Sequence, residues 1–174
     1  MAAPDLTADQ IIHTLGLEPL PVEGGLFRQT YRSNEEVPAQ SLPERYGGES
    51  KPFGSAIFYM LTEQSDSFSS FHRLPTDELF HYYLGDPLEI NLLFPSGESQ
   101  QVILGQDILN GQRLQFAVPA GVWQGSRVVP GGRFSLIGTT MAPGYTPGDF
   151  EVGKRDVLVQ QYPGESEKIR LLTR

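Results

Sequence analysis

The chain has 174 residues and no cysteine, and its 21 acidic side chains outnumber its 13 lysines and arginines, which gives a formal net charge of -8. The lack of cysteine excludes disulfides, thiolate metal sites and cysteine nucleophiles. The negative charge gives no general attraction to nucleic acid. Residues 1–20 lack the basic start and apolar centre of a signal peptide. We therefore expect one cytoplasmic domain over residues 1–174, with neither nucleic acid nor membrane as a partner.

The first expected element is a short helix near the start of the chain. Thr7 and Gln10 have the spacing of a capping box, in which each side chain bonds a free amide at a helix start. The helix should run to about Leu15. Gly16 can then adopt the left-handed conformation that ends a helix.

Strands are expected over most of the remaining chain. Segment 26–33 alternates apolar and polar residues, with Phe27 and Tyr31 predicted on one face. Residues 34–54 are rich in Pro, Gly and Glu and are expected to form a long exposed loop. Beyond it, branched and aromatic residues predict further strands, namely 56–61, 78–84, 88–94, 101–104, 113–118 and 133–140.

Turns and the tail complete the expected architecture. Residues 95–97 and 130–132 combine Pro and Gly and predict hairpin-like turns. The pattern is therefore mainly antiparallel β, as in a barrel or a two-sheet jelly roll. Segments 149–162 and 165–172 have loosely helical spacing and should cover one end or side of the sheets.

Residues 71–85, FHRLPTDELFHYYLG, contain the side chains best suited to chemistry. Imidazole and carboxylate groups bind transition metals and move protons near neutral pH. On an uninterrupted strand Glu78 and His81 point to opposite faces. His81 then faces outward as a structural or interface residue, whereas a bulge just after Glu78 would turn it into the same cavity.

The order of several sequence blocks resembles one family. His72, Glu78 and Gly85 have the spacing of the first cupin motif, and PAGVWQ, residues 119–124, matches the start of the second. The blocks EGGLFRQTYRS, SSFHR, DELFHYYLGDPL, VPAGVWQ and APGYTPGDFEVGKR look like the DUF985, or Cupin_5, branch of the cupin superfamily.

This resemblance covers residues 15–162 and implies a fold. The expected fold is an RmlC-like jelly roll, a double-stranded β-helix barrel over about 26–140, with a short N-terminal helix and a C-terminal helical extension over about 149–172. It also implies a homodimer, because cupin barrels commonly pair through one sheet.

The chain departs from the family at the usual metal ligands. Leu74 stands where metal-binding cupins usually have a second histidine, and Gln124 where they have the last one. His72 and Glu78 alone are fewer than the three protein ligands that zinc, iron or manganese typically take. We therefore expect no metal cofactor. A bulge-shifted His81 would supply the third ligand and allow a metal-dependent oxygenase or isomerase.

Without a metal, an inward pair of His72 and Glu78 can act as a general base, because the carboxylate orients the imidazole and raises its basicity. The resemblance implies a precedent in metal-free sugar-nucleotide epimerases, which use a histidine base and a tyrosine acid. Tyr59 and Tyr82 are the candidates for the acid, or else are structural hydroxyls. Gln124 suits recognition of a neutral polar ligand.

Two further residues are candidates for ligand contacts. Arg28 can reach a carboxylate or phosphate of a ligand, or can pair with Glu23 at the surface. Trp123, the only tryptophan, forms either cavity wall or core. The sequence thus favours binding of a small polar molecule without metal, with isomerase- or epimerase-like chemistry ahead of a metal-dependent oxygenase. A non-catalytic, storage-like barrel is a third alternative.

Overall fold

The computed structural model describes residues 6–174. Residues 1–5, part of the segment 1–20 that was compared with a signal peptide, lie outside the described residues. Helix α1 (Ala8–Leu15) begins after Thr7. The Thr7 hydroxyl accepts a hydrogen bond from the backbone N–H of Gln10, and the side-chain oxygen of Gln10 accepts one from the backbone N–H of Thr7. Gly16 ends the helix at φ 60°. The predicted capping box and left-handed stop are both confirmed. None of the helices within 6–174 is long and apolar enough to cross a bilayer.

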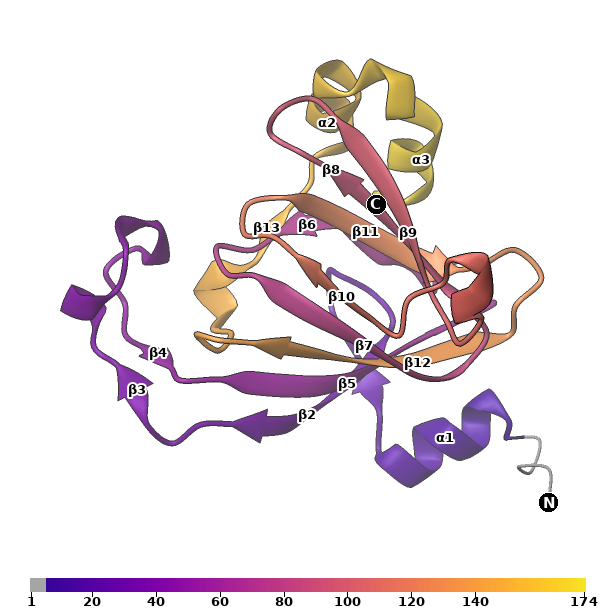
Figure 1. The fold of residues 1–174 in the computed structure, drawn as a ribbon, viewed down its shortest axis with the longest axis horizontal. Coiled ribbons are helices and arrows are strands. Elements are labelled where there is room, and N and C mark those ends of the chain that lie inside the picture. Colours follow the sequence, from indigo (N-terminus) through magenta and orange to yellow (C-terminus); the bar gives the residue numbers. More distant parts are fainter. Residues whose placement is uncertain (1–5) are drawn as a thin grey trace.

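Two antiparallel sheets form the body of the molecule (Figure 1). The larger sheet contains, in spatial order, β1 (Glu18–Pro19), β2 (Leu26–Arg32), β5 (Ser55–Thr62), β12 (Phe134–Met141), β7 (Glu78–Gly85) and β10 (Gln115–Val118). The smaller sheet contains β13 (Glu151–Val152), β6 (Ser69–Arg73), β11 (Trp123–Val128), β8 (Leu88–Leu93) and β9 (Ser99–Leu104). Neighbouring strands are mostly not consecutive in the chain, which is the arrangement expected of a jelly roll.

The main core lies between the two sheets. Leu88, Ile90 and Leu92 alternate along β8 and are fully buried there, together with Leu104 and Ile137 from β9 and β12. This alternation buries one set of side chains from each strand, as a two-sheet fold requires. Apolar packing fills this interior apart from a cavity at one end, described below.

Three helices cover outer faces of the sheets. Helix α1 packs against the outer face of the larger sheet, where Ile11 meets Met60 and Leu136. Helices α2 (Arg155–Gln161) and α3 (Ser166–Leu171) cover the smaller sheet, seen in yellow in Figure 1. Leu158 and Ile169 from these helices pack there in one cluster with Phe71, Leu93 and Trp123. The expected C-terminal helices are confirmed, although residue 149 ends a 3-10 turn, residues 151–152 form β13, and the first helix begins only at Arg155.

The long segment 34–54 differs from the exposed loop that its composition predicted. It contains a two-stranded pair, β3 (Glu36–Val37) and β4 (Lys51–Pro52), and the short turns Ala39–Ser41 and Glu44–Tyr46. Tyr46 and Lys51 are buried. The remaining 3-10 turns of the described chain are Ile108–Asn110, Pro147–Asp149 and Pro163–Glu165.

Strands β6 and β11 were not among the segments predicted from residue preference. Both are short and polar, and β11 contains Gly125. They exist because each pairs with neighbours on both sides, β6 with β11 and β13, and β11 with β6 and β8. The predicted turn at 95–97 joins β8 to β9 as a hairpin. The turn at 130–132 instead carries the chain from one sheet to the other, so its prediction as a hairpin was wrong.

A bulge breaks the predicted alternation of β2. The pairing with β5 passes from Gln29 and Ile57 directly to Tyr31 and Ala56, which leaves Thr30 as the extra residue. Phe27 consequently faces the cavity, whereas the side chain of Tyr31 is exposed. The expectation that Phe27 and Tyr31 share a face was therefore wrong.

Candidate functional site

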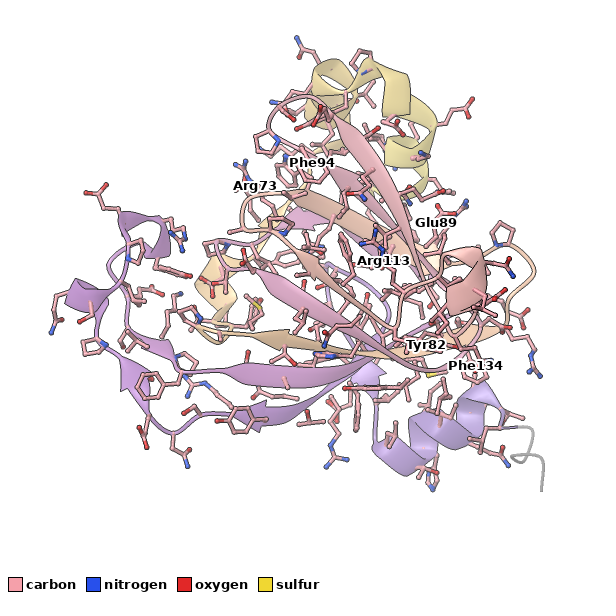
Figure 2. All side chains as sticks on the ribbon, viewed as in Figure 1. Arg73, Tyr82, Glu89, Phe94, Arg113 and Phe134 are labelled. Atoms are coloured by element: carbon pink, nitrogen blue, oxygen red, sulfur yellow. The ribbon has the colours of Figure 1, made fainter. Side chains whose placement is uncertain are left out.

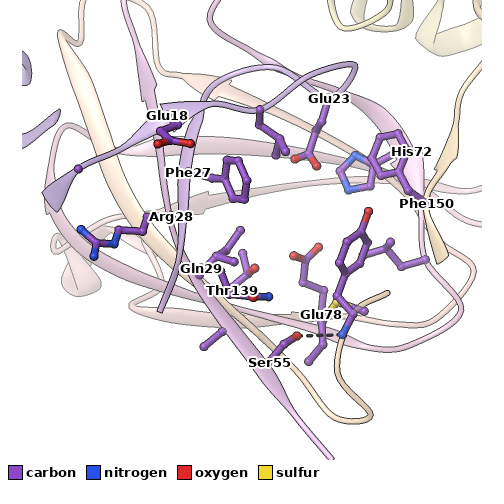
Figure 3. A pocket seen from close by; sticks show the side chains of 17 residues that line it. Glu18, Glu23, Phe27, Arg28, Gln29, Ser55, His72, Glu78, Thr139 and Phe150 are labelled. Atoms are coloured by element: carbon purple, nitrogen blue, oxygen red, sulfur yellow. Dashed lines mark hydrogen bonds between the residues drawn. The ribbon is translucent and has the colours of Figure 1, made fainter. Parts of the chain in front are cut away.

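A cavity of about 660 Å³ lies between the two sheets, bounded by strands β2, β5, β6, β7 and β12 and by the loop after β12 (Figure 3). Its lining residues include the polar or ionisable His72, Glu23, Glu78 and Tyr145 and the aromatic Phe27 and Phe150. The cavity therefore brings polar groups from distant parts of the chain together between aromatic walls.

His72 is buried on β6, and its two ring nitrogens have different partners. Nδ1 lies 2.8 Å from the carbonyl oxygen of Ser70. Because a carbonyl only accepts, Nδ1 carries the proton, and Nε2 of the neutral ring is left as an acceptor. Gln124 Nε2, 3.3 Å away, can donate to it. Phe150 stacks on the imidazole at a centroid distance of 5.0 Å, which orients the ring further.

Gln124 connects His72 to Glu78. Its strand, β11, pairs with β6 so that Gln124 stands opposite His72. The same amide nitrogen that donates to His72 donates its second proton to Glu78 Oε2 at 2.6 Å. The expected direct pair of His72 and Glu78 is thus a bridge through an amide, and the Ser70 carbonyl sets the imidazole tautomer. The amide oxygen of Gln124 is buried and has no hydrogen-bond partner within residues 6–174.

The Glu78 carboxyl group is buried beside the cavity. Burial raises the pKa of Glu78, and repulsion from Glu23 raises it further, while attraction to His72 and hydrogen bonds from Thr139 and Gln124 oppose the rise. Glu78 therefore takes up a proton at a higher pH than an ordinary glutamate does. This property suits a group that binds or transfers protons near neutral pH.

A Glu78→Gln variant is expected to be more stable than the natural protein at neutral pH. The raised pKa of Glu78 stabilises the fold at low pH, and this contribution is lost as pH rises from the ordinary glutamate pKa to the raised one. Glutamine avoids that loss because it carries no charge at any pH. Thermal unfolding at pH 7 and at about pH 4 should show the gain only at pH 7. An equal destabilisation at both values would contradict this account.

Tyr145 is a cavity residue that sequence reasoning missed. Its backbone N–H donates to Ser55 Oγ at 2.9 Å, and its side chain lines the cavity. Burial raises the pKa of the Tyr145 hydroxyl, with smaller contributions from Glu23, Asp149 and Glu78. The residue lies in a loop after the last long strand, inside the family-like block APGYTPGDFEVGKR. That block was the only signal that could have pointed to it.

Neither tyrosine predicted as the acid lines the cavity. Tyr59 is buried in the core on β5, and its hydroxyl donates to the Gly24 carbonyl at 2.9 Å. Burial, followed by repulsion from Glu23, raises the pKa of Tyr59 well above its usual value. The Tyr82 hydroxyl donates to the Gly85 carbonyl, and Figure 2 shows Tyr82 toward that end of β7. Both hydroxyls therefore have structural partners outside the cavity.

His81 faces away from the cavity, as strand alternation predicted. Its Nε2 lies 3.1 Å from Thr140 Oγ1, and its Nδ1 lies 3.0 Å from the side-chain nitrogen of Gln115. The irregularity in β7 falls between Tyr82 and Leu84, beyond His81, so Glu78 and His81 keep opposite faces. Residues 6–174 contain no group of three His, Asp or Glu side chains placed to hold a metal ion.

Trp123 lies outside the cavity, and Arg28 lies at its rim. Trp123 faces α2 and α3, with the Arg73 guanidinium 4.6 Å from its ring centroid, so it is core and not wall. Arg28 lies at the rim and donates to the Leu15 carbonyl at 2.8 Å. In Figure 3 its side chain points away from His72 and Glu78. Glu23, the surface partner considered for Arg28, accepts instead from Ser69 Oγ at 2.9 Å.

Comparison with known proteins agrees with this architecture. The family model described as "Cupin superfamily (DUF985)" matches residues 9–153. The chain belongs to the cupin superfamily. This cupin is 35% identical to the solved protein SO0799 from Shewanella oneidensis, at a TM-score of 0.83, over 97% of this chain and 98% of that one. A hypothetical protein from Leishmania major gives 29% identity and a TM-score of 0.85, over 97% and 99% of the two chains.

More distant similarities extend to yeast and to a known enzyme. This cupin is 28% identical over 136 residues to the uncharacterized protein YML079W of Saccharomyces cerevisiae. The match covers 74% of this chain but 65% of the yeast protein, under two thirds of its length. An oxalate decarboxylase from Bacillus subtilis is 12% identical at a TM-score of 0.51, over 90% of this chain and 37% of that one. At this identity the likeness concerns the fold alone.

Proposed function

We propose that this cupin binds a small polar molecule in the cavity between its sheets and does so without a metal ion. The observation that carries the proposal is the buried bridge from His72 through Gln124 to Glu78. His72 and Glu78 line the cavity, and Gln124 lies behind them. A volume of about 660 Å³ suits a small-molecule ligand. Phe27 and Phe150 supply apolar walls, and the polar groups would set the orientation of the ligand.

Proton transfer is the chemistry that these groups support, as in an isomerase or epimerase. Glu78 is the better base, because both nitrogens of His72 are already engaged by Ser70 and Gln124. His72 then acts as a positioning residue, holding Gln124 and through it Glu78. Tyr145 lines the same cavity and can supply the acid, a role for which Tyr59 and Tyr82 are poorly placed.

The donor set supports binding without a metal. Leu74 lines the cavity without offering a ligand atom, and Gln124 binds transition metals weakly through its amide. We expect elemental analysis of the purified protein to find iron, manganese and zinc well below one atom per chain. Added divalent ions should leave the melting temperature unchanged. One tightly held metal ion per chain would overturn this part of the proposal.

A metabolite screen by thermal shift tests the site directly. Any compound that stabilises the protein should bind His72→Ala and Glu78→Ala at least about tenfold more weakly, a loss of about 1.4 kcal/mol each. Tyr82→Phe is the matched control, since the Tyr82 hydroxyl bonds the Gly85 carbonyl outside the cavity. Unchanged affinity in both alanine variants would show that the compound binds elsewhere and that the cavity is not the site.

The outer face of the larger sheet supports a homodimer. His81 and Tyr83 face outward there, Tyr31 and Tyr83 are 55% and 48% exposed, and α1 covers only the other part of the face. Exposed aromatic clusters on a sheet favour association. Light scattering is expected to give twice the chain mass of 19.3 kDa.

Substitutions locate this interface. Tyr83→Glu should shift the protein toward the monomer, because it places a charge on the apolar face. Leu109→Glu is the control, since Leu109 is 94% exposed in the turn Ile108–Asn110. A monomeric natural protein at micromolar concentration would contradict the proposal.

A further inference from the structure

We infer that the cavity selects an organic cation, a compact molecule carrying a protonated amine, over an anion of the same size. The inference rests on the proposed function, that the cavity binds a small polar molecule, and names the charge class of that molecule. It follows from which charged groups face the cavity and which partners they already have.

Negative groups dominate the cavity wall. Glu18, Glu23 and Glu78 all line it, and Arg28 is the single lysine or arginine among the lining residues. The Arg28 guanidinium donates to the Leu15 carbonyl and points away from His72 and Glu78 (Figure 3). An anionic ligand would therefore meet carboxylates with no lysine or arginine side chain directed at it.

The two inner carboxylates lack cationic partners. Glu23 accepts from the Ser69 hydroxyl and Glu78 from the Gln124 amide, both of which are neutral donors. Neither glutamate takes part in any of the ion pairs formed within residues 6–174. The Glu78 carboxylate is buried, so leaving it without a countercharge is costly, and a ligand ammonium would relieve that cost. Burial raises the pKa of the Tyr145 hydroxyl, and the charges of Glu23, Asp149 and Glu78 raise it further.

Hydrogen-bonding capacity and ring positions favour the same ligand class. The carboxylates of Glu23 and Glu78 can only accept, and an ammonium group offers three N–H donors. Phe27 and Phe150 also line the cavity, and aromatic faces attract cations. A carboxylate or phosphate supplies no donors and adds repulsion at close range. The geometry thus disfavours the anionic ligand for which Arg28 was considered.

Three probes of the same shape test the inference: cyclohexylamine, cyclohexanol and cyclohexanecarboxylate. Each is titrated at pH 7 into the full-length protein, and binding is followed by the NMR shifts of the backbone amides of Tyr145 and Phe150. The ammonium probe is expected to bind at least tenfold tighter than the carboxylate, with the alcohol between them.

Variants show whether the preference comes from the cavity. Glu23→Gln and Glu78→Gln should each weaken the ammonium probe several-fold more than the alcohol, because glutamine removes the charge and keeps an acceptor oxygen. Glu98→Gln is the control, because it removes one charge from the exposed turn between β8 and β9. Equal or tighter binding of the carboxylate at Tyr145 and Phe150 overturns the charge inference and leaves the proposed binding function standing. No cavity shift with any probe overturns both.

Discussion

A Lys51→Met variant is expected to lose about 3–5 kcal/mol of stability, which lowers the melting temperature of a domain of this size by roughly 6–20 °C. Lys51 Nζ lies 2.7 Å from Asp149 Oδ1, and the two side chains are only 2% and 3% exposed. Lys51 also bonds the Thr146 hydroxyl, and Asp149 accepts from the Thr146 backbone amide. Removing the ammonium therefore leaves a buried carboxylate without its countercharge.

Two further variants separate this loss from a general effect of removing a lysine. Lys168→Met breaks an exposed ion pair with Glu165, where the Lys168 side chain is 41% exposed, and should cost less than about 1 kcal/mol. The double variant Lys51→Met, Asp149→Leu should recover part of the stability, because no buried charge remains. Recovery stays partial since Thr146 loses an acceptor. Equal melting temperatures for Lys51→Met and Lys168→Met would refute the assigned role of the buried pair.

A Phe71→Ala variant should lose about 3–5 kcal/mol, measured by urea unfolding. Phe71 is fully buried on the outer side of β6, between the smaller sheet and the helices α2 and α3. A Cβ placed on Gly125 would lie 3.2 Å from its ring, so the aromatic side chain fills the space that this glycine leaves. Truncation opens a void that the paired strands and the helices can close only in part.

An exposed phenylalanine provides the comparison. Phe53 lies beside β4 and is 50% exposed. Changing it to alanine should lower the free energy of unfolding by less than about 1 kcal/mol. Its backbone bond to the Glu35 carbonyl is unaffected by that change. If Phe71→Ala proved no more harmful than Phe53→Ala, the packing of α2 and α3 on β6 would not contribute as proposed.

Some features of the fold and of the site could be predicted from residue order, because they depend only on near neighbours along the chain. The capping box at Thr7 needs only Gln10, three positions on. The opposite faces of Glu78 and His81 need only an unbroken strand between them. The family-like blocks likewise indicated the jelly roll.

Other predictions failed because short-range rules do not include partners from distant strands. Residue preference missed β6 and β11, whose polar sequences are strands because each has a partner on both sides. The bulge at Thr30 turned Tyr31 outward. Composition placed Lys51 in an exposed loop, yet its ion pair with Asp149 joins positions 98 residues apart.

The start of helix α1 is a feature that residue order alone determines. Each side chain near Thr7 finds its partner within one helical turn, so local geometry is sufficient. The cavity is different, because Glu78, Gln124 and Tyr145 come from separate segments that meet only when the two sheets face each other. The charge of the cavity, and so the class of ligand that it favours, depends on how the two sheets pack. The burial of Glu78 and its lack of a cationic partner are properties of the fold, and residue order alone does not determine them.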